Sequence, residues 1–95
     1  MEVVISRSSK PDKRLKAKFA SKTVHFGSKT GSTFVDHGNN QTKKAWIARH
    51  RVRENWEDYD SAGALAKHVL WNKTTMKASI ANLNSMQSQY RFKLG

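Results

Sequence analysis

The chain has 95 residues and no cysteine, and its 18 lysines and arginines against 7 aspartates and glutamates give a formal net charge of +11. This length allows one domain with a modest core, and the lack of cysteine excludes a disulfide framework or a zinc site with cysteine ligands. No apolar run approaches membrane-spanning length and the first residues lack a signal-peptide pattern, so we expect a protein that is neither secreted nor bound to a membrane.

The first third of the sequence predicts short antiparallel strands. The β-branched residues Val3–Ile5 favour a strand that runs to about Arg7. From Arg14 to Phe19 apolar and basic residues alternate, which is the period of a half-buried strand. Its inward residues would be Leu15, Ala17 and Phe19, and its exposed basic residues Arg14, Lys16 and Lys18. A turn at 20–22 and a partner strand at 23–26 would complete a hairpin.

The segment 27–33 is rich in Gly, Ser and Thr, and small residues of this kind can cradle a phosphate. It lacks the Lys after the second Gly and the following helical pattern that a P-loop requires, so we interpret it as a flexible loop. Residues 33–35 could form a further short strand, and 36–40 have the composition of a turn.

Three helices are predicted near residues 41–53, 61–71 and 75–87. The first is strongly basic, and the second and third show apolar residues at helical spacing, with Ser61 and Thr74 or Thr75 as N-caps. The last two should form a helical hairpin. In the tail beyond them Tyr90, Phe92 and Leu94 alternate with polar residues, so the tail could form a final strand or a docked extended end. We therefore expect an α+β fold, with a short N-terminal antiparallel sheet followed by about three helices. The predicted core consists of Leu15, Phe19, Val24, Phe26, Trp46, Ile47, Leu65, Val69, Trp71 and Ile80.

The basic residues are the best candidates for a binding function. A charge this large on a small domain predicts a polyanionic partner, most commonly nucleic acid, unless the surplus charge only aids solubility. Phosphate contacts require only a positive surface and do not read sequence. The expected contacts are Arg14, Lys16 and Lys18 on the strand, Lys43, Lys44, Arg49 and Arg51 on the first helix, and Lys67, Lys73 and Lys77 on the hairpin. Trp46, Trp56 and Trp71 could stack on bases, but we expect them in the core.

Catalytic chemistry has little support in the sequence. The four histidines show no i, i+4 pair that would indicate a helical zinc site, and we expect neither a metal nor another cofactor. Asp36, His37, His50 and Asn55 loosely match the residue content of one-metal nucleases, although their order fits poorly. No nucleophile stands beside an evident base, so we expect no enzymatic activity.

Four segments together resemble a family of small basic proteins of uncharacterised activity that giant, nucleocytoplasmic large DNA viruses encode. The segments are VVISRSSKPDKRLKA, KTVHFG, IARHRVRENW and AGALAKHVLWNKTTMKASI, and the resemblance spans residues 3–82. It implies a viral protein located in the virion or in the reducing interior of an infected cell, and it supplies no catalytic residues.

These observations lead to one main expectation and two alternatives. The main expectation is a virion-associated protein that binds nucleic acid, DNA above all, without sequence specificity, as in genome packaging or condensation. The first alternative is a minor capsid or scaffold-type structural protein that binds acidic surfaces of capsid proteins. The remote alternative is a metal-dependent nuclease.

Overall fold

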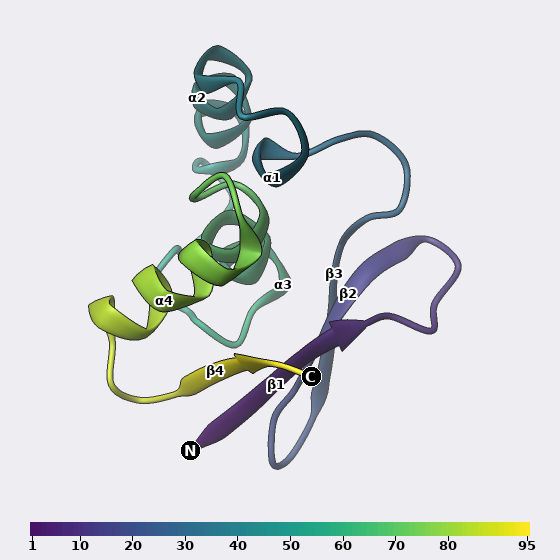
Figure 1. Cartoon of the computed structure of the whole chain (residues 1–95), viewed down its shortest axis with the longest axis vertical. Helices are drawn as coiled ribbons and strands as arrows, with labels where there is room; N and C mark the ends of the chain where they lie inside the picture. The colour runs from purple at the N-terminus through teal and green to yellow at the C-terminus, as the bar shows by residue number, and fades with distance from the viewer.

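Four strands form one mixed sheet in the computed structural model, which describes residues 1–95 (Figure 1). The strands are β1 (Glu2–Arg7), β2 (Lys13–Lys18), β3 (Thr23–Ser28) and β4 (Arg91–Leu94), and their order in the sheet is β3-β2-β1-β4. The first three strands are antiparallel, whereas β4 runs parallel to β1. The α+β class is thus confirmed, but the prediction of a wholly antiparallel, N-terminal sheet is wrong because the end of the chain returns to pair with its beginning.

Side-chain alternation divides the sheet into a buried face and an open face. Val3 and Ile5 on β1 are buried, as are Leu15 and Ala17 on β2. These residues are the inward positions that the alternation of β2 predicted. Lys16 therefore lies on the opposite face, where its neighbours in the register are Ser6 and His25.

The helices lie close to the predicted segments. They are α1 (Phe34–His37), α2 (Asn40–His50), α3 (Ala62–Leu65), the π-helical turn η1 (Ala66–Leu70) and α4 (Met76–Met86). The single helix predicted at 61–71 is thus an α-helical turn that continues as a π-helical turn, in which the Trp71 N–H donates to the carbonyl of Ala66 at 3.2 Å. The helix predicted at 41–53 ends at His50, and Val52 beyond it is 80% exposed. None of these helices is long and apolar enough to cross a membrane.

The segment 33–35, which could have formed a strand, instead begins helix α1. Thr33 is its N-cap, and the Thr33 N–H donates to Asp36 Oδ2 at 2.7 Å, as in a capping box. Phe34 is buried under the short helix, and Gly38 ends it with φ of +63°, a conformation that favours glycine. The spacing Thr-x-x-Asp carried this signal in the sequence.

The core lies between the sheet and the helices α3, η1 and α4. Seven of the predicted core residues are buried: Leu15, Phe19, Phe26, Leu65, Val69, Trp71 and Ile80. The other three, Val24, Trp46 and Ile47, are only half-buried. For Trp46 and Ile47 the reason is the position of α2, which has no buried residue and lies beyond α3 and α4, at the top of Figure 1.

Candidate nucleic-acid interface

Most of the positive charge has no carboxylate partner within the protein. Of the 18 lysines and arginines, three lie within salt-bridge distance of a carboxylate. The pairs are Arg14–Asp36, Lys22–Asp60 and Lys93–Glu2, with N–O distances of 2.7, 3.0 and 3.0 Å. The surplus charge is therefore not neutralised within the protein, and its distribution decides where an anion can bind.

We call three lysines the lysine cluster: Lys43 on α2, Lys67 on η1, and Lys73 between η1 and α4. Lys43, on α2, is held in place because its Nζ donates to the carbonyl of Asn72 at 2.6 Å and lies 4.6 Å from the centre of the Phe34 ring. The pKa of Lys43 is lowered, first by desolvation and then by the positive charge of Lys73. Its ammonium is thus fixed on Asn72 and Phe34, where the charge of Lys73 still acts on it.

Lys67, on η1, extends the lysine cluster. Its Nζ lies 5.7 Å from the centre of the Trp56 ring, a position that allows a cation–π contact. Desolvation lowers the pKa of Lys67, and the charge of Lys43 lowers it further. Both effects disfavour the charged form of Lys67. An anion bound beside Lys67 would offset the repulsion from Lys43.

An aromatic stack fixes α2, and with it Lys43, to the rest of the fold. The Trp46 ring lies 5.0 Å from that of Trp71 with an interplanar angle of 11°. Trp46 also stacks on His50 at 4.2 Å and on Trp56 at 6.0 Å. The tryptophans therefore pack on one another, although only Trp71 is buried in the core, as predicted, and Trp46 and Trp56 are half-buried. Through this packing they position α2 and Lys43.

The ten predicted contact residues fall into two separate groups. Lys16 and Lys18 lie on the open face of the sheet, where Lys16 and Lys10 lower the pKa of His25, after the larger effect of desolvation. The lysine cluster lies on the helical side. The other predicted residues on that side are exposed: Lys44, Arg49 and Arg51 on and just after α2, and Lys77 in the first turn of α4.

Arg14 differs from the other predicted contacts because it is already paired. Its Nη1 and Nη2 donate to the two carboxylate oxygens of Asp36 at 2.7 and 2.9 Å, and Nη1 also lies 3.4 Å from Thr33 Oγ1. This pairing raises the pKa of Arg14 and holds the pKa of Asp36 far below its usual range. The alternation with Lys16 predicts Arg14 as a free cation on the exposed strand face. In the structure Arg14 is instead paired with Asp36.

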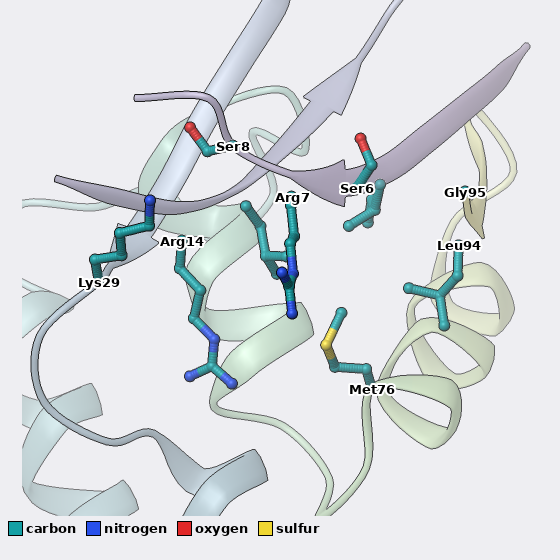
Figure 2. A pocket seen from close by; sticks show the side chains of 10 residues that line it. Ser6, Arg7, Ser8, Arg14, Lys29, Met76, Leu94 and Gly95 are labelled. Atoms are coloured by element: carbon teal, nitrogen blue, oxygen red, sulfur yellow. The ribbon is translucent and has the colours of Figure 1, made fainter. Parts of the chain in front are cut away.

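A hollow of about 520 Å³ contains two cations that the sequence did not single out (Figure 2). We call it the Arg7 pocket. Its basic residues are Arg7, Arg14 and Lys29, and its other lining residues are Ile5, Ser6, Ser8, Leu15, Met76, Leu94 and Gly95. Arg7 follows Val3 and Ile5 at the strand period and so points to the helical side just past the core. The alternation of Val3, Ile5 and Arg7 in the sequence therefore predicts the side of the sheet on which Arg7 lies.

The segment 27–33, which includes the end of β3 and the N-cap of α1, borders a second hollow, of about 510 Å³. The opposite wall includes Trp46, Arg49 and His50 of α2 together with Trp71. Because Trp46 already stacks on other rings, its faces are occupied by the protein itself.

The residues that matched nuclease content have other partners. Asp36 binds Arg14, and His37 Nδ1 accepts the N–H of Asn39 at 2.8 Å. His50 Nδ1 lies 2.8 Å from the carbonyl oxygen of Trp46. No group of three or more His, Cys, Asp or Glu residues lies close enough to hold a metal ion.

The comparisons with known proteins identify one family. A family of unknown function (DUF5754) matches residues 3–50, which is half of the chain and covers the segment from β1 to α2. No curated protein and no solved structure matches. The matched segment contains Arg7, Arg14, Lys29 and Lys43, whereas Lys67, Lys73 and Met76 lie outside it.

Proposed function

The chain belongs to DUF5754, a family of unknown function, and we propose that it binds nucleic acid, DNA above all, through phosphate contacts and without sequence specificity. The observation that carries this proposal is the lysine cluster: none of its three lysines has a carboxylate partner, the charge of Lys73 lowers the pKa of Lys43, and the charge of Lys43 lowers that of Lys67. Repulsion among like charges, with Lys43 and Lys67 partly desolvated, destabilises a folded protein. Bound phosphates offset that cost, because duplex DNA carries one negative charge per about 1.7 Å of helix axis.

The chemistry of the cluster also accounts for the lack of sequence specificity. An ammonium is a compact point charge that binds a phosphate oxygen from many directions, and it does not match the paired groups on a base edge as an arginine or asparagine does. Lys43 is fixed by Asn72 and by the stack that holds α2, so part of the positive surface is ordered before binding. We expect affinity to depend on charge and little on sequence.

The resemblance to proteins of giant DNA viruses suggests the biological setting of this activity. We propose a virion-associated role in genome packaging or condensation. The alternative partner is an acidic surface of a capsid protein, which the same lysines would fit.

A pair of double variants tests the location of the site. Lys67→Gln with Lys73→Gln removes two charges from the lysine cluster, and the control, Lys22→Gln with Lys93→Gln, removes two charges that already pair with carboxylates. Fluorescence anisotropy with a labelled 30-mer duplex should show about a tenfold loss of affinity for the cluster variant, from roughly 0.7 kcal/mol per phosphate contact.

The control variant should bind nearly as well as the natural protein. An equal loss in both variants would mean that net charge alone matters and would contradict the proposed location. No binding of any duplex at low salt, together with retention on an acidic capsid protein, would favour the alternative partner.

A further inference from the structure

The Arg7 pocket has the two kinds of wall that a nucleotide needs. Arg7 and Lys29 supply positive charge, and the side chains of Met76 and Leu94 supply apolar surface. No Asp or Glu side chain lines the pocket. Figure 2 shows the Arg7 side chain between that of Arg14 and that of Met76.

The cations of the pocket have unused capacity to bind an anion. Arg7 and Lys29 are exposed and form no salt bridge. A guanidinium has five N–H donors. Arg14 uses both hydrogens of Nη1 and one of Nη2 on Asp36 and Thr33, which leaves its Nε–H and one Nη2 hydrogen. Asp36 thus orients Arg14 without using all of its donors.

The start of α4 adds to the positive potential of the pocket. Met76, which lines the pocket, is the first residue of this 11-residue helix, and Thr75 caps it by accepting the N–H of Ala78. A helix N-terminus carries a partial positive charge and free backbone N–H groups. The helix end and the arginines therefore favour the same kind of ligand.

Helix α1 connects the pocket to the lysine cluster. Its Asp36 binds Arg14 of the pocket, and its Phe34 lies under the ammonium of Lys43. A nucleic-acid strand whose phosphates run along the lysine cluster can thus reach the Arg7 pocket by crossing helix α1.

We infer that the Arg7 pocket binds a nucleoside phosphate, with the phosphate on Arg7 and Lys29 and the base against Met76 and Leu94. This inference deepens the proposed function and rests on it for the source of the ligand, which is one unstacked nucleotide of a single strand. Within a duplex the base is stacked and paired and does not reach the apolar wall. A free mononucleotide offers the same chemistry, and the experiment separates the two sources.

The test compares ligands and variants by calorimetry and anisotropy on the full chain. Adenosine monophosphate should bind more tightly than adenosine or inorganic phosphate, because only the nucleotide contacts both walls. Arg7→Gln should weaken the binding of the nucleotide and of a single-stranded 10-mer by about tenfold, the typical effect of one charged hydrogen bond. Its effect on a 30-mer duplex should be smaller than threefold. Lys93→Gln is the control that removes equal charge.

The outcomes distinguish this inference from the proposed function. Nucleotide binding that is no tighter than phosphate binding, or that is unchanged by both Arg7→Gln and Lys29→Gln, would overturn the inference even if the duplex binds. Binding of the free nucleotide without binding of the 10-mer would overturn the single strand as the source. Loss of duplex binding alone would instead count against the proposed function. Circular dichroism melting would show that Arg7→Gln remains folded, as expected for an exposed side chain.

Discussion

Asp36 links α1 to the sheet through its contacts with Thr33 and Arg14. One carboxylate oxygen accepts the Thr33 N–H and both oxygens accept from Arg14. These hydrogen bonds hold the pKa of Asp36 well below its ordinary value, and the bond with Arg14 has the largest effect. The carboxylate therefore stabilises the fold in its charged form.

Acid should remove the contribution of Asp36. Since its pKa is depressed in the folded state, the stabilisation is complete above the ordinary aspartate pKa of about 3.9 and is lost as the pH falls toward the lower folded-state pKa. Urea unfolding between pH 5 and pH 2 should show a steeper fall in the free energy of unfolding for the natural protein than for Asp36→Asn. Equal slopes would contradict this assignment.

His68 should produce a second pH dependence, near neutrality. It is buried, and its Nε2 donates to the carbonyl of Trp56 at 2.8 Å, while its Nδ1 has no partner. Burial is the main cause that lowers its pKa, so the folded protein favours the neutral ring. The unfolded chain takes up the proton first as the pH falls below about 6.5, and stability should decline from there. His68→Gln should lack this decline in urea titrations at pH 7 and pH 5.5, and an unchanged decline would refute the assignment.

At the scale of elements, β3 and η1 approach each other closely at Gly27. Gly27 has φ of +77°, and a Cβ built there would lie 2.7 Å from Cδ1 of the fully buried Leu70. Gly31 has a similar φ of +83° but has open space around it. Both glycines thus have a positive φ that favours glycine, but only at Gly27 would an added side chain meet a neighbouring residue.

This difference gives a matched pair of variants. Gly31→Ala should lower the free energy of unfolding by about 1 kcal/mol, through backbone strain alone. Gly27→Ala should lower it by a further ~1–3 kcal/mol, because Leu70 must shift in a close-packed core. Guanidinium unfolding measures both values, and equal losses would show that the approach to Leu70 is unimportant.

The aromatic stack separates the stability of the core from the placement of α2. Trp71→Ala, at a buried position, should cost about 3–5 kcal/mol and act through unfolding of the whole protein. Trp46→Ala, on a helix without buried residues, should cost less and should chiefly raise hydrogen exchange in α2. Exchange monitored by mass spectrometry would contradict this view if Trp46→Ala loosened the sheet as much as α2.

Local patterns predicted these elements better than they predicted how the elements meet. Alternation identified β2 and its inward side, and helical spacing with the caps Ser61 and Thr75 identified α3 and α4. The parallel pairing of β4 with β1 joins the two ends of the chain, and no local pattern encodes it. Trp46 was placed in the core because large aromatic residues usually are, whereas tertiary packing leaves α2 outside it.

The same limit applies to the candidate site. Charge counting found the lysines, and the fold then separated Lys16 and Lys18 from the lysine cluster. Arg7 and Lys29 are 22 residues apart in the sequence and line one hollow only after the sheet forms. Arg14 is already paired with Asp36, a residue of a helix that the sequence did not predict.

At the scale of the whole molecule, the charge of +11 exceeds what the fold neutralises internally. If about five cations meet phosphates of duplex DNA, the counterions that they displace make log K fall against log[salt] with a slope of about −4 to −5, or roughly 0.9 per phosphate. Because ammonium groups do not read bases, two duplexes of unrelated sequence should give the same slope and nearly the same affinity.

The most direct test of phosphate binding is therefore a salt titration with two unrelated 30-mer duplexes, followed by anisotropy. We predict binding to both at 50 mM salt, with slopes of about −4 to −5 that become shallower by about two units when Lys67→Gln and Lys73→Gln are combined. Absence of binding at 50 mM salt, or a slope near zero, would contradict the account.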